Sequence, residues 1–139
     1  MHLAIDGYDA DREKLEDPEF VLRFLDEYPS AIGMTKIMPP HVLTYRGPQP
    51  EDWGISGFVI IAESHISVHT FPDRRYVNID IFSCKEFDVE QALDVVKQRF
   101  SLELTKSWIL ERGLEHYTEE KARLTLGLER LSLARQNGS

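Results

Sequence analysis

The sequence predicts one α+β domain, a two-layer sandwich with helices on one face of a mainly antiparallel sheet. Two observations lead to this prediction. Short apolar or alternating segments recur along the chain, as strands do. Two further segments repeat their apolar residues at helical spacing. Because these helices are interposed in a series of strands, we expect them to pack together on one face of the sheet. A chain of 139 residues is long enough for one core but not for two.

The first part of the chain predicts a strand followed by a helix. Residues 2–8 form an apolar segment that stops near Gly7. Asp17 and Pro18 then supply a helix N-cap and a proline at the first helical position. One apolar face at helical period follows, and the segment 29–33 is expected to end the helix. The residues of that face are Phe20, Val21, Phe24, Leu25 and Tyr28.

The middle of the chain predicts most of the sheet. Residues 37–45 contain two adjacent prolines, so we expect an interrupted or edge strand, because proline cannot donate to a ladder. A loop is expected at 47–52. Three strand patterns follow, and the last of them alternates apolar and polar residues up to Cys84. These patterns occupy residues 58–61, 66–69 and 76–84.

The remaining segments predict a second helix, a last strand and a tail. Asp88 with Gln91 three residues later is typical of a capping box. The inward face of this helix would carry Ala92, Val95, Val96 and Phe100, beside Leu93. Residues 107–110 predict a final strand. We therefore expect the folded domain to span residues 1–115, followed by a helix-prone tail at 116–139.

Composition excludes several classes of protein. The formal charge of −8, without a cluster of Lys and Arg, disfavours a nucleic-acid binder, whose affinity depends on neutralising phosphates. No apolar run is long enough to cross a membrane, and no secretory signal is visible. The only cysteine cannot form an internal disulfide, which fits a reducing compartment. We therefore expect a cytoplasmic protein without membrane contacts.

The residues with chemical potential lie between 63 and 84. Ser64 follows one strand pattern and precedes another, so it is expected at a tight connection, where most serines serve only the turn. His65 and His69 share one face of a strand, but no third ligand lies at metal-binding spacing, and we predict no metal. No Gly-x-Ser-x-Gly motif surrounds Ser64, which argues against a hydrolase triad. Taken alone, Cys84 would be a small buried residue.

The combined pattern resembles the small bacterial and archaeal S-adenosylmethionine decarboxylases, which depend on a pyruvoyl group. In that family a Glu-Ser-His-x-Ser-x-His-Thr-x-Pro segment precedes Asp-x-Phe-x-Cys. This chain has Glu63-Ser64-His65-Ile66-Ser67-Val68-His69-Thr70, then Pro72, then Asp80-Ile81-Phe82-Ser83-Cys84. Upstream, Gly54-Ile55-Ser56-Gly57 resembles the family's Gly-Val-Ser-Gly segment. The likeness extends from about His2 to about Trp108.

The resemblance implies a chain that makes its own cofactor. The Ser64 hydroxyl would attack the carbonyl of Glu63, and elimination would cut the chain into residues 1–63 and 64–139, leaving a pyruvoyl group at position 64. His69 would be the base for the elimination, since imidazole titrates near neutral pH. Ser56 would support processing by stabilising the oxyanion. No metal and no pyridoxal phosphate would be needed.

The resemblance also implies the reaction. The substrate amine would form a Schiff base with the pyruvoyl group, which accepts electrons as carbon dioxide leaves. Cys84 would return a proton, and the product would serve spermidine synthesis. Ile66 and Asp73 are the expected substrate contacts, and the active form is expected to be a homodimer of cleaved protomers. Asp73 replaces the family's usual glutamate, and the loop 46–53 looks longer than usual.

Two alternatives remain open at this point. A pyruvoyl-dependent decarboxylase of arginine or ornithine would keep the chemistry, and the altered recognition region and the acidic N-terminal half are compatible with it. A relative that binds a nucleoside or a protein without catalysis would keep only the fold. The second alternative has no use for a serine, a histidine and a cysteine that match the family's pattern together.

Overall fold

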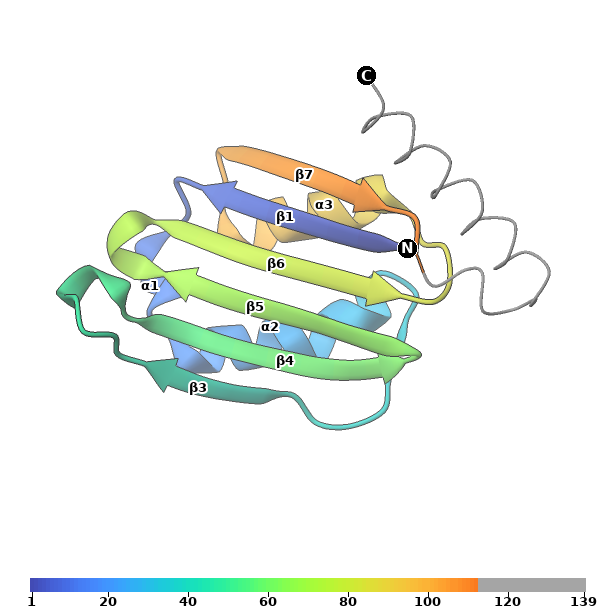
Figure 1. Ribbon diagram of the computed structural model, residues 1–139, viewed down its shortest axis with the longest axis horizontal. Coiled ribbons are helices and arrows are strands. Elements are labelled where there is room, and N and C mark those ends of the chain that lie inside the picture. Colours follow the sequence, from blue (N-terminus) through green and yellow to red (C-terminus); the bar gives the residue numbers. More distant parts are fainter. Residues whose placement is uncertain (113–139) are drawn as a thin grey trace, which may run out of the picture.

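The computed structural model describes residues 1–112, which form two layers (Figure 1). One layer is an antiparallel sheet with seven strands in this part of the chain, and described helices cover only one of its faces. We call the other face the open face. The predicted α+β architecture is confirmed, whereas the tail at 116–139 lies outside the described residues. The strands are β1 (His2–Tyr8), β2 (Thr35–Lys36), β3 (His41–Tyr45), β4 (Gly54–Ala62), β5 (Ser64–Phe71), β6 (Tyr76–Ser83) and β7 (Leu104–Leu110).

The strand order places β5 near the middle of the sheet. The order is β2-β4-β5-β6-β1-β7, and β3 pairs with the same edge of β4 as β2 does. The interrupted strand predicted at 37–45 is therefore two short strands, β2 and β3, on either side of Pro39 and Pro40. The last strand is longer than predicted, since it starts at Leu104.

Helices and short turns make up the second layer and the connections. They are α1 (Arg12–Leu15), α2 (Pro18–Ala31), α3 (Val89–Phe100) and the 3₁₀ turns η1 (Pro50–Asp52) and η2 (Pro72–Arg74). The sequence did not predict α1, because four residues are too few to show a helical period. The end of α2 lies two residues beyond Pro29, whose carbonyl accepts from Met34 N–H at 2.8 Å.

Aspartates cap the two long helices as predicted. Asp17 Oδ1 accepts from the backbone N–H of Glu19, and Asp88 Oδ1 accepts from that of Gln91, each at 3.0 Å. The capping box is only half formed, however. The Gln91 side chain donates instead to the carbonyl of Ala31, at 3.3 Å, and so ties the start of α3 to the end of α2.

The core lies between the sheet and the helices. Alternation along β6 buries Val77, Ile79 and Ile81 completely, as the sequence pattern predicts. The same alternation runs through β1, β4 and β5, so every second residue of these strands faces the open side instead. From the helices, the largest buried side chains are Leu15, Phe24, Leu25, Tyr28 and Phe100. On α3, Ala92, Val96 and Phe100 are buried, and Leu93 and Val95 only partly so.

Candidate active site

Ser64 and Cys84 meet at the end of the sheet where β4 turns into β5. Glu63 alone connects these strands, and Ser64 is the first residue of β5. The φ angle of Ser64 is +143°, a region that residues with side chains rarely adopt. Ser64 pairs with Ser83, the last residue of β6, so Cys84 follows directly beside it. The distance from Ser64 Oγ to Cys84 Sγ is 3.5 Å.

The backbone of Cys84 also contacts the bond that precedes Ser64. Cys84 N–H donates to the carbonyl oxygen of Glu63 at 3.3 Å. A nucleophile that attacks this carbonyl would place negative charge on the same oxygen, and an N–H donor already directed at it would stabilise that charge. The sequence pattern had placed Cys84 within the strand. Because β6 ends at Ser83, the thiol and the backbone N–H of Cys84 both face residues 63 and 64.

Ser56 and His69 form a second pair on the open face. They lie opposite each other on β4 and β5, and Ser56 Oγ is 2.9 Å from His69 Nδ1. The tautomer of the ring decides which atom donates. A hydrogen bond at Nδ1 orients the imidazole and leaves Nε2 for a reacting group, which is the arrangement expected of a base.

The structure does not bring these two pairs together within one chain. Ser64 begins β5, and His69 lies five residues further along the same extended strand. At about 3.3 Å per residue, their Cα atoms are about 16 Å apart. Closeness in sequence therefore does not bring Ser64 and His69 together in space. Each chain instead carries two half-sites, which we call the Ser64 end and the His69 end (the right and left ends of β5 in Figure 1).

Two glycines allow β4 to pack closely at the His69 end. A Cβ atom on Gly54 would lie 1.7 Å from the carbonyl oxygen of Thr70. On Gly57 it would lie 2.8 Å from Leu25 Cδ1 and 2.9 Å from the carbonyl oxygen of His41. These contacts explain why glycine stands on either side of the Ile55-Ser56 pair: any larger residue would displace β4 and with it the Ser56 hydroxyl.

Two hollows flank the Ser56–His69 pair. The larger, about 500 Å³, runs over β3, β4 and β5, and Leu43, Phe58 and Ser67 contribute to its lining. The smaller, about 220 Å³, lies beside Tyr45 and Phe71. Both include Ser56 and His69 in their walls. The His69 end therefore has room for a ligand, and its walls are mainly apolar.

The two expected substrate contacts differ in their availability. The side chain of Ile66 is fully buried in the core, and its contact with a substrate stays a prediction. Asp73 lies on η2, beyond the far end of β5 from Ser64, and is partly exposed. Arg12 Nη2 donates to Asp73 Oδ1 at 2.7 Å, which fixes the carboxylate near the His69 end.

Sequence reasoning missed a polar row that continues from His69 across the open face. The strand registers align His69 with Asn78 on β6, and Asn78 with Asp6 on β1. Asn78 Nδ2 donates to Asp6 Oδ1 at 2.7 Å and to the Tyr76 hydroxyl at 2.6 Å. Partial burial raises the pKa of the Tyr76 phenol, and the Asp6 carboxylate adds to this effect. Only the pairing of distant strands brings these residues together, so no local pattern could have identified them.

Neither a cluster of metal ligands nor a membrane-spanning helix is found in the described part of the chain. Among residues 1–112, no three His, Cys, Asp or Glu side chains converge as metal ligands would. None of the helices in that range is both long and apolar enough to span a membrane.

Comparison with known proteins identifies the family. Residues 1–113 match the family model described as S-adenosylmethionine decarboxylase. The chain is similar to the S-adenosylmethionine decarboxylase proenzyme of Pyrococcus furiosus, at 30% identity over 99% of this chain and 95% of that protein. The proenzyme of Archaeoglobus fulgidus is 32% identical over 81% of this chain and 96% of its own length.

A solved structure shows the same fold. The adenosylmethionine decarboxylase from Aquifex aeolicus superimposes with a TM-score of 0.68 and 26% identity, covering 81% of this chain and 89% of that one. The fold and the family match together place the chain among the carboxy-lyases. The chain belongs to the S-adenosylmethionine decarboxylase family, in its prokaryotic form, and is a decarboxylase.

Proposed function

We propose that this chain is a proenzyme that cleaves itself between Glu63 and Ser64 and then decarboxylates S-adenosylmethionine. The observation that carries the proposal is the Ser64 end, where a hydroxyl, a thiol and the scissile carbonyl gather around one strand junction. This arrangement fits a pyruvoyl group made from Ser64. The family match, and the word proenzyme in the relatives' names, support the same conclusion.

Cleavage begins with an acyl shift. Ser64 Oγ forms a bond to the carbonyl carbon of Glu63, the peptide C–N bond breaks, the hydroxyl proton passes to the Ser64 nitrogen, and an ester joins the two residues. The Cys84 N–H stabilises the oxyanion that develops on the Glu63 oxygen. The hydroxyl belongs to the residue next to its target, and this proximity supplies part of the rate acceleration. The strained φ of Ser64 is released when the backbone rearranges.

Elimination then cuts the chain. A base removes the Cα proton of Ser64, the Cβ–Oγ bond breaks, and the new carboxylate of Glu63 leaves with the oxygen. Water hydrolyses the remaining dehydroalanine with loss of ammonia, which gives a pyruvoyl group at the start of the fragment 64–139. We assign the base to His69, held by Ser56, although the two half-sites lie about 16 Å apart in one chain.

A homodimer resolves this separation. In this dimer the open faces of two copies meet, and the two-fold axis lies in the interface and passes over the middle of β5. The rotation then brings the Ser64 end of each copy opposite His69 of the partner subunit. An interface of this kind is self-complementary, so both sites would be completed at once. We therefore propose that each active centre combines Ser64 and Cys84 of one copy with Ser56 and His69 of the partner subunit.

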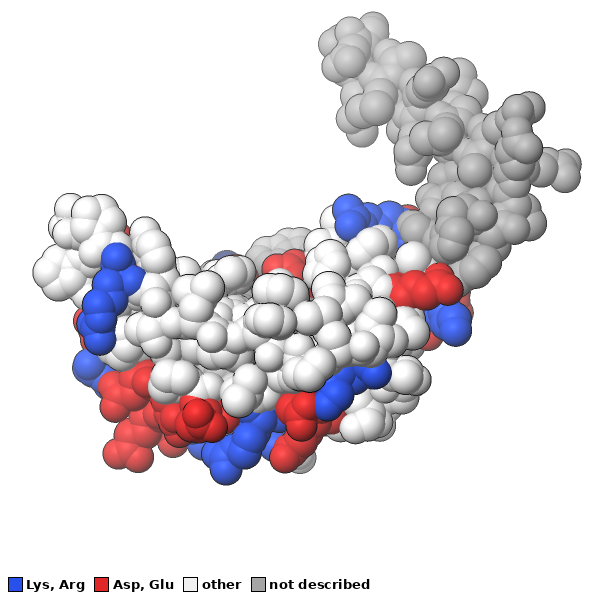
Figure 2. Space-filling model, turned by 90° about the horizontal axis from the view of Figure 1, so that it is seen from below, with Lys and Arg blue, Asp and Glu red and all other residues white. Residues whose placement is uncertain are grey.

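The character of the open face supports this dimer. Figure 2 shows that charged side chains gather mainly along the helix side, the lower edge of that view, whereas the strand side above is largely uncharged and hollowed. Large apolar side chains are exposed there at open-face positions of β3, β4 and β7, and a second copy would cover them. They are Leu43, Tyr45, Phe58, Leu104, Trp108 and Leu110, each between 43% and 60% exposed.

Decarboxylation uses the same two half-sites. A pyruvoyl group at position 64 supplies an electron sink for the electrons released with carbon dioxide. We assign the reprotonation of the product to Cys84, whose sulfur lies 3.5 Å from the Ser64 oxygen. Asp73, fixed by Arg12 near the His69 end, is the proposed contact to substrate bound between the two copies. A cytoplasmic location stays a prediction.

Replacing Cys84 with alanine should separate the two reactions. We expect the chain still to cleave, since the backbone N–H at position 84 remains, but to decarboxylate at least about 100-fold more slowly because the proton donor is gone. Intact mass would follow cleavage, and carbon dioxide release would follow turnover. Cys84→Ser is the matched variant and should also cleave. Full turnover in Cys84→Ala would remove the thiol from the mechanism.

A substrate comparison tests the proposed activity itself. The purified, cleaved protein should release carbon dioxide from S-adenosylmethionine and not from arginine or ornithine at equal concentration. Reduction with cyanoborohydride should trap substrate on the 64–139 fragment and should not label the 1–63 fragment. Release from arginine or ornithine alone would establish the alternative substrate class, and release from none of the three would contradict the proposed activity.

A further inference from the structure

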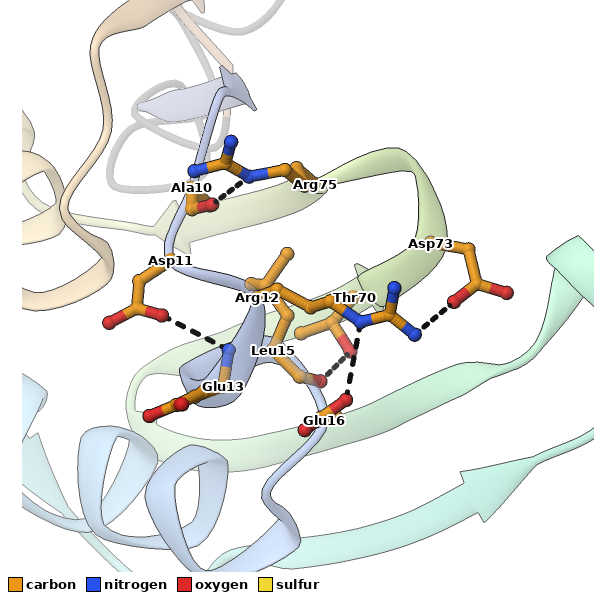
Figure 3. A network of polar contacts seen from close by, with 9 residues as sticks. All are labelled: Ala10, Asp11, Arg12, Glu13, Leu15, Glu16, Thr70, Asp73 and Arg75. Atoms are coloured by element: carbon orange, nitrogen blue, oxygen red, sulfur yellow. Dashed lines mark hydrogen bonds and ion pairs between the residues drawn. The ribbon is translucent and has the colours of Figure 1, made fainter.

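The hydroxyl of Thr70 is buried at the His69 end and joins three segments of the fold. Thr70 directly follows His69 on β5, and only 2% of it is exposed. Its Oγ1 donates to the carbonyl of Leu15 at 2.7 Å, and the same atom accepts from Ile55 N–H at 2.9 Å. Figure 3 shows the threonine directed at the last residue of α1. One hydroxyl thus links α1, β4 and β5.

The hydrogen bond from Ile55 N–H to Thr70 lies just beyond the last backbone-paired residues of β4 and β5. The paired register of β4 and β5 ends at Ser56 and His69. One residue beyond that pair, Ile55 N–H bonds to the Thr70 side chain. The Thr70 hydroxyl therefore fixes the residue before Ser56, and the backbone pairing of β4 with β5 fixes Ser56 and the residues after it.

The contact to α1 holds the hydroxyl in place. A hydroxyl has one hydrogen to donate, and donating it to Leu15 turns a lone pair toward Ile55. The surrounding segment is anchored independently, since Arg12 pairs with Asp73 and Arg75 Nε donates to the carbonyl of Ala10 at 2.9 Å (Figure 3). The Leu15 carbonyl therefore holds the Thr70 hydroxyl in place, and the hydroxyl in turn holds β4 at Ile55.

We propose that Thr70 is a positioning residue that holds Ser56 Oγ in hydrogen-bond contact with His69 Nδ1. This role is additional to those of Ser64, His69, Cys84 and Ser56, and it rests on the proposed function of the Ser56–His69 pair. Because only 2% of Thr70 is exposed, we assign it no contact with the scissile bond or with a substrate. It acts by fixing the partner that orients the imidazole, and it should therefore affect the rate of self-cleavage and the tautomer of His69.

The test replaces the hydroxyl without changing the size of the side chain. Thr70→Val keeps the volume and loses both hydrogen bonds, whereas Thr70→Ser keeps both. Tyr28→Phe is the matched control, because it removes another buried hydrogen bond, from the Tyr28 hydroxyl to the carbonyl of Ala92 at 2.8 Å, on the α2–α3 side of the core. Each variant is expressed as the full chain, and intact mass gives the rate of cleavage after synthesis.

We expect Thr70→Val to cleave roughly 10- to 100-fold more slowly, since displacing a reacting group by an ångström can cost about 100-fold. Thr70→Ser should restore cleavage to within about threefold of the parent chain, and Tyr28→Phe should cleave as the parent does. Parental cleavage in Thr70→Val would overturn the proposal. Equal slowing in Thr70→Val and Tyr28→Phe would overturn it too, because the effect would then be one of stability alone.

A second readout does not depend on cleavage. In chains that also carry Ser64→Ala and so stay whole, nitrogen NMR of the His69 ring reports its tautomer and the hydrogen bond at Nδ1. Thr70→Val should shift the Nδ1 resonance, and Thr70→Ser and Tyr28→Phe should leave it unchanged. An unchanged His69 signal in Thr70→Val would overturn the proposal. If the parent chain never cleaves, the proposed function fails, yet this comparison still decides the role of Thr70. Should Thr70→Val not fold, Thr70→Cys, whose thiol bonds only weakly, replaces it with the same expected and contradicting results.

Discussion

Replacing Ser64 with alanine is expected to abolish self-cleavage and decarboxylation together. The variant lacks the oxygen that attacks the Glu63 carbonyl, so the chain should stay whole at 139 residues. Alanine also removes the only source of the pyruvoyl group. Loss of decarboxylation should therefore be complete, to the limit of a carbon dioxide assay.

The control for this experiment is Ser30→Ala. Ser30 lies near the end of α2, on the helix side of the sheet, and its hydroxyl donates to the carbonyl of Glu27 at 3.1 Å. We expect this variant to cleave and to fold as the parent does, which would show that removing a serine hydroxyl is not itself disruptive. Efficient cleavage of the Ser64→Ala chain at residue 63 would contradict the assignment of the nucleophile.

Two inactive chains are expected to restore cleavage when they are produced together. His69→Ala should not cleave, because its sites lack the base, and Ser64→Ala should not cleave for lack of the nucleophile. In a mixed dimer, one site combines Ser64 and Cys84 of the first chain with Ser56 and His69 of the second. The His69→Ala chain should therefore be cut in mixed dimers and nowhere else. The expected change is from no product to a readily measured fraction.

Masses that differ by a short tag identify which chain is cut. The matched control is a chain with both Ser64→Ala and His69→Ala, which forms the same mixed dimers but cannot supply the imidazole, and it should restore nothing. If the His69→Ala chain cleaves by itself, His69 is not the base. If mixed dimers form and the chain stays whole, the base acts within its own chain, and the shared site is wrong.

The sequence predicted most elements because their periods are strong. Val77, Ile79 and Ile81 alternate with polar residues and prove fully buried on one face of β6. The apolar face of α2 is buried as its spacing predicts, except that Phe20 is only partly buried. Caps at Asp17 and Asp88 were also predictable, since the capping interaction is local. The helix α1 was not predictable, because four residues are too few to show a helical period. Its position is set by contacts with η2 and β5.

The arrangement of the site was harder to predict than its residues. Ser64 and His69 are only five positions apart in the sequence. Because both lie on one extended strand, their Cα atoms are nevertheless about 16 Å apart. The contact of Cys84 with Ser64 depends on where β6 ends, and strand ends are poorly determined by alternation. Thr70 gave one usable signal. A threonine at the third apolar position of β5, after Ile66 and Val68, must find partners for its hydroxyl once it is buried.

The mass of the purified protein tests the whole account most directly. A denatured sample of the folded protein should contain two polypeptides, residues 1–63 with a normal carboxyl end and residues 64–139 with a ketone in place of the serine amine. The larger fragment should react with a carbonyl reagent such as a hydrazine, and the smaller one should not. A single unbroken chain that does not react with the reagent would contradict self-cleavage, and with it the proposed centre at Ser64.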